Sequence, residues 1–179
     1  MTSRVRKLTL TAHVVFSVGW LGAVAGFLAL AVAGLVGQDP QTVRSAYLMM
    51  ELTGWFVLVP LAGASLVSGL VQSLGTEWGV FRHYWVLGKL IINVIATVVL
   101  LLYMQTLGSL GRIAGKPTLS DNDLSVLRSP SPVLHSGAAL ALLVIATVLA
   151  VYKPRGKTRY WQRKQQMNRA LASVDPWRR

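Results

Sequence analysis

The chain has 179 residues, of which 53% are hydrophobic and only 13% are charged. Because soluble domains carry about a quarter of charged residues, and this chain holds several apolar runs of about 20 residues, the composition predicts an integral membrane protein. Cysteine is absent, which excludes disulfides, thiolate metal sites and thiol catalysis. The basic residues behind the formal net charge of +12 lie mostly outside the apolar runs. We therefore expect them to set the orientation in the membrane and to contact anionic lipid, and we expect no nucleic-acid partner.

Four apolar segments predict an all-α bundle of four transmembrane helices. The first segment, Leu8 to Val36, has no charged residue and follows a basic stretch, which is typical of a membrane span. It is about twice as long as the apolar region of a signal peptide, so we expect a retained span. The predicted four-helix domain, residues 1–152, has spans at about 10–36, 45–74, 84–107 and 133–152, and a basic tail occupies residues 153–179.

The connections contain helix breakers and one helix-start signal. The second span is long enough to tilt or to kink at Pro60. The longest connection, residues 109–132, is rich in glycine, serine and proline. Within it, the sequence from Ser120 to Asp123 predicts the start of one short surface helix.

Small residues occur four positions apart in two of the predicted spans. Such pairs let helix backbones approach closely in lipid, where hydrophobicity supplies no drive for association. We therefore expect helix packing at Gly22 with Gly26 in the first span and at Ser65 with Gly69 in the second.

Lysine and arginine are distributed unevenly between the two sides of the predicted bundle. Of the 18 basic residues, 13 fall on the side of the N-terminus, the Arg82 loop and the tail; four fall on the other side, and Lys89 lies within a span. The positive-inside rule therefore predicts that both termini are cytoplasmic. We expect anionic lipid at the basic tail, and a second copy of the chain or another membrane protein as a partner.

His13 and Lys89 are predicted to lie at similar depth in the inner half of the bundle. His13 follows Lys7 by six residues, about 9 Å along a helix, and Lys89 follows Arg82 by seven, about 10 Å. Ionisable residues inside membrane spans are costly, so each is a candidate functional residue. The alternatives are a Lys89 that snorkels to the headgroups and an interfacial His13 bonded to a backbone carbonyl.

Further polar residues recur around both of these residues at helical spacing. The two polar stripes are His13, Ser17 and Trp20 in the first span, and Lys89, Asn93 and Thr97 in the third. Two polar stripes in an apolar bundle are expected to face each other. The predicted cofactor-binding residues of this inner site are His13, Trp20, Trp85, Lys89 and Asn93.

A second group of polar residues is predicted in the outer half. His135 precedes Lys153 by 18 residues, about 27 Å along a helix, and a buried Glu51 needs a partner, for which His135 and Arg44 are candidates. Carboxylate, imidazole and thioether groups are ligand types that copper accepts. The predicted metal ligands are Glu51, His135, Met49, Met50 and Met104. The alternative is a structural pair of Glu51 with His135, and methionines that fill space.

Two stretches of the sequence resemble known membrane protein families. The stretch from His13 to Gly22, HVVFSVGWLG, resembles the first helix of the HemJ-type protoporphyrinogen oxidases, in which tryptophan follows a histidine after seven residues. The stretch from Trp85 to Leu90, WVLGKL, resembles a later helix of these enzymes and has the aromatic-to-lysine spacing of CopD-like copper-resistance membrane proteins. Over its first three spans the chain is similar to an uncharacterised family of small bacterial four-helix integral membrane proteins.

The resemblance implies that His13 is an axial haem ligand or a tetrapyrrole contact, and that Lys89 holds a propionate or transfers a proton. It also implies a place in the bacterial cytoplasmic membrane. The chain departs from the HemJ pattern because no arginine lies between Gly22 and Val36, and because Met104 stands where a histidine is expected.

Three functions are therefore open. They are haem or tetrapyrrole binding at the inner site, copper handling at the outer site, and a structural or accessory membrane subunit without small-molecule chemistry. The sequence contains no nucleophile elbow, phosphate loop or closely spaced metal-ligand pair, so we expect no enzymatic activity. A primary transporter is not expected either, because there is neither a nucleotide site nor a repeat of broken spans.

Overall fold

The computed structural model describes residues 2–75, 84–152, 161, 163 and 165–167. Within these residues the chain forms helices and no strand. The elements are α1 (Ser3–Val36), α2 (Pro40–Thr53), a π-helical turn (Gly54–Leu58), α3 (Val59–Gly75), α4 (Tyr84–Ala114), α5 (Asp121–Leu127) and α6 (Ser131–Tyr152). The predicted basic tail, residues 153–179, lies almost wholly outside the described residues.

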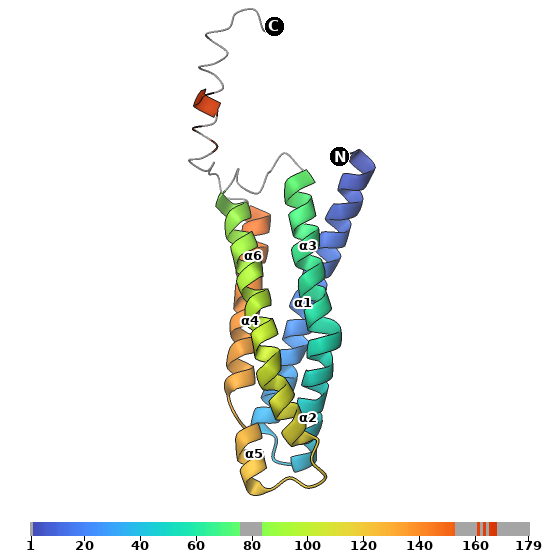
Figure 1. The fold of residues 1–179 in the computed structure, drawn as a ribbon, viewed down its shortest axis with the longest axis vertical. Coiled ribbons are helices and arrows are strands. Elements are labelled where there is room, and N and C mark those ends of the chain that lie inside the picture. Colours follow the sequence, from blue (N-terminus) through green and yellow to red (C-terminus); the bar gives the residue numbers. More distant parts are fainter. Residues whose placement is uncertain (1, 76–83, 153–160, 162, 164, 168–179) are drawn as a thin grey trace, which may run out of the picture.

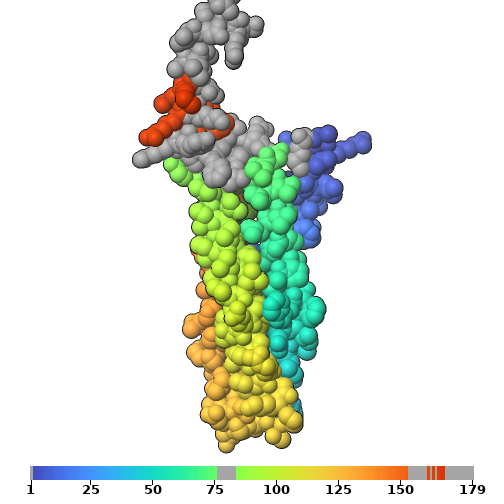
Figure 2. Space-filling model, viewed as in Figure 1, coloured from blue at the N-terminus to red at the C-terminus, as the bar shows by residue number. Residues whose placement is uncertain are grey.

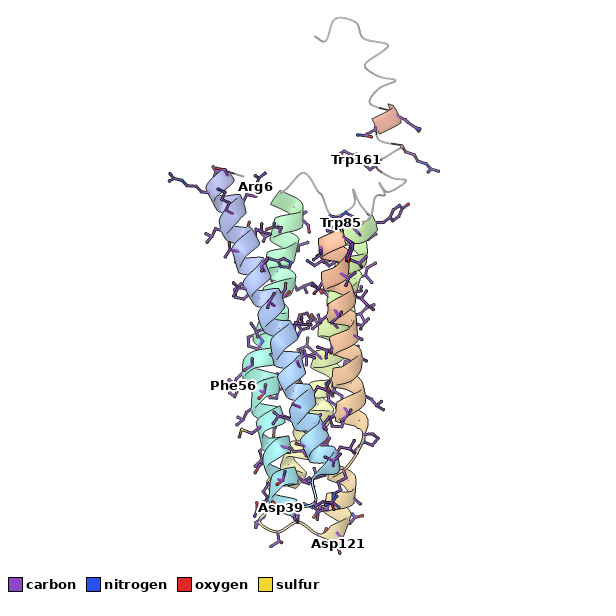
Figure 3. All side chains as sticks on the ribbon, turned by 180° about the vertical axis from the view of Figure 1, so that it is seen from behind. Arg6, Asp39, Phe56, Trp85, Asp121 and Trp161 are labelled. Atoms are coloured by element: carbon purple, nitrogen blue, oxygen red, sulfur yellow. The ribbon has the colours of Figure 1, made fainter. Side chains whose placement is uncertain are left out.

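Four segments are long and apolar enough to cross a membrane, which confirms the predicted all-α fold with four candidate spans. They are Ser3–Val36, Pro40–Gly75, Tyr84–Ala114 and Asp121–Tyr152. Large apolar side chains cover the outside of the bundle, as lipid-facing helices require. Phe56, for example, is 76% exposed and points away from the helices (Figure 3).

The helices form an elongated bundle in which α1 packs against α2, α3 and α6, and α4 packs against the same three elements (Figures 1 and 2). The start of α1 and the end of α6 lie at one end, which we call the N-terminal end. The turn between α1 and α2 lies with α5 at the opposite end, which we call the α5 end. Toward the N-terminal end, α1 pairs with α3 and α4 pairs with α6 (Figure 1).

Side-chain caps fix where the helices at the α5 end begin. The carboxylate of Asp39 accepts hydrogen bonds from the backbone N–H and the hydroxyl of Thr42, both at 3.0 Å, and Pro40 occupies the first turn, where its missing N–H costs nothing. Donation from the backbone N–H groups of Gln41 and Thr42 holds the pKa of Asp39 below its ordinary value. Ser120 and Asp123 form a capping box, so the helix predicted to start here is confirmed as α5.

A π-helical turn accommodates Pro60 within the second span. Proline cannot donate the backbone hydrogen bond of an α-helix. Immediately before it, the Val59 N–H donates to the carbonyl of Gly54, five residues back. The extra residue in this turn shifts the hydrogen-bond register, so the helix continues through Pro60 as α3.

The α5 end is held together by three long side chains. Tyr47 is 1% exposed, and its hydroxyl donates to the carbonyl of Leu127 at the end of α5. The Arg44 guanidinium donates to the carbonyl of Ala114, the last residue of α4, and to those of Lys116 and Pro117 just beyond it. The Arg128 guanidinium donates to the carbonyls of Gly37 and Gln38, which follow α1. The two arginines thus satisfy carbonyls that a helix end leaves without partners.

The small-residue pairs have two different outcomes. Ser65 is 1% exposed and bonded to Ser17, and Gly69 lies against His13, so this pair packs on α1 as predicted. The prediction for Gly22 and Gly26 is wrong within the described chain, because a Cβ on either glycine would find no neighbouring atom within 4 Å. Both glycines lie on the outer surface of α1.

We expect Gly54→Val to lower the free energy of unfolding by about 1–3 kcal/mol, the usual cost of overpacking. A Cβ on Gly54 would lie 2.7 Å from both Sδ and Cε of Met104, which is 1% exposed and has little space to move. The same substitution at Gly26, where the space is open, should change stability by less than about 0.5 kcal/mol. Chemical unfolding in mixed micelles measures both, and equal losses in the two variants would contradict the packing described.

Candidate functional site

His13 lies in the N-terminal half of the bundle and makes two hydrogen bonds across it. The imidazole is 7% exposed, with Nδ1 3.1 Å from the hydroxyl of Ser68 on α3 and Nε2 3.0 Å from the ammonium of Lys89 on α4. Counting residues along the spans predicts the similar depth of His13 and Lys89, and the structure brings the two side chains into contact.

The hydrogen bonds of Ser68 define which nitrogen of His13 carries the proton. The Ser68 hydroxyl lies 2.6 Å from the carbonyl of Ala64 and donates its hydrogen there. Its oxygen therefore accepts from His13, so Nδ1 is protonated and Nε2 carries the lone pair. Lys89, as a pure donor, then donates to Nε2.

Glycine at position 69 gives the imidazole its place against α3. A Cβ on Gly69 would lie 2.9 Å from Cε1 and 3.4 Å from Nδ1 of His13. One turn deeper, Ser17 and Ser65 bond each other at 2.9 Å across the same pair of helices. These contacts hold the ring of His13 in one orientation, which a functional histidine needs.

The side chains of this region line a cavity of about 500 Å³ between α1, α3, α4 and α6, a volume in the range of small-molecule sites. The five predicted cofactor-binding residues all lie in its wall: His13, Trp20, Trp85, Lys89 and Asn93. Trp85 lies toward the N-terminal end (Figure 3). Sequence patterning missed further polar residues that line the same cavity, namely Gln72 and Ser73 of α3 and Thr147 of α6.

Lys89 brings a cation into this wall, and no acidic partner for it lies among the described residues. The described lining of the cavity contains no aspartate or glutamate. The one ion pair within the described chain joins Lys116 to Asp123, 2.6 Å apart at the α5 end. Thr97, the last member of the predicted stripe, donates its hydroxyl to the Asn93 carbonyl at 2.8 Å and is not part of the wall.

The predicted outer site has a different arrangement. His135 is exposed, stacks on Tyr103 with ring centroids 4.2 Å apart, and has Nδ1 2.8 Å from the carbonyl of Ser131. The carboxylate of Glu51 lies against Gly108 and Gly111 of α4. Within the described residues no hydrogen bond or ion pair joins Glu51 to His135.

The other residues assigned to the outer site also have structural surroundings of their own. Met50 and Met104 are 0% and 1% exposed in the core, Met49 is 47% exposed, and Arg44 bonds carbonyls after α4 in place of Glu51. No cluster of three or more histidine, aspartate or glutamate side chains suited to a metal ion occurs in the described part of the chain. In the described residues, the half of the bundle toward the α5 end therefore shows packing and helix capping.

The fold and the cavity together define a helical protein with four candidate membrane spans and a largely apolar cavity between them, in whose described wall Lys89 is the one cation. Comparison with known proteins adds no name to this class. No family model matches the chain, and neither a curated protein nor a solved structure shows a significant match.

Proposed function

We propose that this protein is a multi-pass protein of the bacterial cytoplasmic membrane that binds an amphipathic carboxylic acid in the cavity beside His13 and Lys89. Tetrapyrroles such as haem belong to this ligand class, because they join propionate groups to a flat apolar ring. The observation that carries the proposal is the cation of Lys89, half-buried in the wall of the cavity without an acidic partner among the described residues.

A lone cation inside a membrane span is costly, and such residues mark binding or transport sites. The neutral imidazole of His13 does not balance the charge of Lys89, because a hydrogen bond between them leaves the net charge in place. A ligand carboxylate would balance it and add a charge-assisted hydrogen bond. An apolar ligand body would then fill the space between the helices.

The arrangement of His13 suits the haem member of this class. Histidine ligands of metals commonly donate their second ring N–H to a fixed acceptor, and Ser68 supplies that acceptor for Nδ1. Among the described residues, Nε2 is bonded to Lys89 alone. If Lys89 turned to a propionate, the lone pair of Nε2 would be free to bind iron, and the haem would supply the redox chemistry.

The distribution of basic residues supports a cytoplasmic position for the N-terminal end and for both termini. The cavity would then lie in the inner leaflet half of the membrane, and anionic lipid would surround its entrance. A structural or accessory role without a ligand gives no reason for a cation at the position of Lys89, because an apolar side chain of similar size would pack there at lower cost.

Titration of the purified protein with haem tests the proposal. We expect a shifted Soret band, loss of the shift in His13→Ala, and no change in His135→Ala, the matched histidine at the α5 end. A parallel titration with octadecanoate, followed by calorimetry, tests the wider class of acids. The proposal fails if the wild-type protein has no higher affinity than Lys89→Met for either ligand, haem or octadecanoate.

A further inference from the structure

We propose that the ligand of this cavity carries a second, uncharged oxygen acceptor, a carbonyl group, which the indole N–H of Trp20 binds deep in the bundle. This inference rests on the proposed binding of an amphipathic acid at Lys89 and specifies that acid further. The ligand class becomes a membrane-soluble oxo acid, with its carboxylate at Lys89 and its carbonyl at Trp20.

The indole of Trp20 is the orphaned polar group of the cavity. Trp20 is 2% exposed and lines the cavity, yet its Nε1–H has no hydrogen-bond acceptor within the described chain. Buried tryptophan N–H groups usually have a partner, and an unsatisfied donor in a lipid-embedded bundle costs several kcal/mol. The neighbouring hydroxyls of Ser17 and Ser65 bond each other at 2.9 Å. A ligand oxygen is therefore the acceptor that this donor lacks.

Asn93 of α4 offers a second polar group in the same part of the cavity. Its side chain is in the wall and the residue is 6% exposed. In the described part of the chain its side-chain amide makes no hydrogen bond, whereas its backbone carbonyl accepts one from the Thr97 hydroxyl. The Asn93 amide is thus a second donor, from α4, that is available to a ligand in this part of the cavity.

The depth of these donors sets the spacing within the ligand. Trp20 follows His13 by seven residues, about 10 Å along α1, and Asn93 follows Lys89 by four, about 6 Å along α4. The carbonyl should therefore lie about 6–10 Å from the carboxylate. An acid without an oxygen at this distance would leave the indole N–H unsatisfied.

The surroundings of Trp20 require the second acceptor to be uncharged. The wall at this depth includes Leu21, Leu143 and Ala146, and Lys89 is the one charged side chain among the described wall residues. A second carboxylate there would have no cation beside it and would be strongly disfavoured. A neutral carbonyl satisfies the indole N–H without that cost. Protohaem, whose oxygen atoms all belong to its propionates, would leave Trp20 unused.

Two probe acids that differ only in the carbonyl test the inference on the purified full-length protein in detergent. They are octadecanoate and 7-oxooctadecanoate, whose dissociation constants are measured by calorimetry. We expect the oxo acid to bind wild-type protein about 3- to 10-fold more tightly, the effect of one neutral hydrogen bond. Trp20→Phe keeps an aromatic ring but removes the donor, so the two acids should then bind with equal affinity.

Trp55→Phe is the matched control, because Trp55 is 49% exposed on the outside of the bundle and should leave the preference intact. A second readout in the wild-type protein is the indole ¹⁵N–¹H resonance of Trp20, which should shift with the oxo acid and not with octadecanoate. Equal affinities in the wild type, or a preference that persists in Trp20→Phe, would overturn the inference. If neither these acids nor haem binds the wild type more tightly than Lys89→Met, the proposed function itself fails.

Discussion

Replacing Lys89 by methionine should weaken binding of an amphipathic acid by about 10- to 100-fold, while the unliganded protein keeps or gains stability. Hydrogen bonds to charged groups contribute about 1.5–3 kcal/mol, which corresponds to the expected loss of affinity. Methionine has a similar length and no charge, so it removes a half-buried cation from the bundle. Such replacements are often neutral or stabilising. Calorimetry with octadecanoate and unfolding in mixed micelles measure the two effects separately.

The opposite signs of these effects distinguish a binding residue from a structural one. If Lys89 only supported the position of His13 through its 3.0 Å hydrogen bond, Lys89→Met would lower the free energy of unfolding and would not change the affinity for octadecanoate. Lys7→Met is the matched control, since Lys7 is exposed at the start of α1 and should alter neither quantity. A Lys89→Met variant that loses stability and binds octadecanoate as the wild type does would contradict the prediction.

The depth of His13 and Lys89 could be predicted because helical rise converts sequence distance from a basic flank into depth. The same reasoning placed Asn93 and Trp20 on the faces that line the cavity. Ser68 and Gly69 were not assigned to the site, although they fix the imidazole. Their roles depend on the register between α1 and α3, which residue spacing within one helix does not contain.

The α5 end shows a different limit of sequence analysis. Arg44 and Arg128 counted only as basic residues on the less basic side, whereas each bonds carbonyls at the end of another helix. These partners lie about 70 to 90 residues away in sequence. Because every residue has a backbone carbonyl, the residue types do not indicate which carbonyls accept these bonds. Gly22 and Gly26 failed for a related reason, because their spacing permits close packing without specifying which neighbouring helix approaches.

Tyr47 shows how tightly this end is packed, and its replacement should give the largest loss of stability. Tyr47→Ala should lower the free energy of unfolding by about 3–5 kcal/mol, as for other large aromatic residues truncated in cores. Its ring fills the space beside Gly34, where a Cβ would lie 3.1 Å from Cε2. Its hydroxyl links α2 to the last carbonyl of α5, so truncation removes both a core side chain and the tie between two elements.

Tyr47→Phe separates these two contributions, because it keeps the ring and removes the hydroxyl. The Leu127 carbonyl would lose its buried donor, and we expect a loss of about 1–3 kcal/mol. Tyr152→Ala is the control for truncating a tyrosine as such, since Tyr152 is 79% exposed at the end of α6 and should change stability by about 0.5 kcal/mol or less. Unfolding in mixed micelles ranks the three variants. If Tyr47→Ala lowered the free energy of unfolding no more than Tyr152→Ala does, the tight packing described for the α5 end would be contradicted.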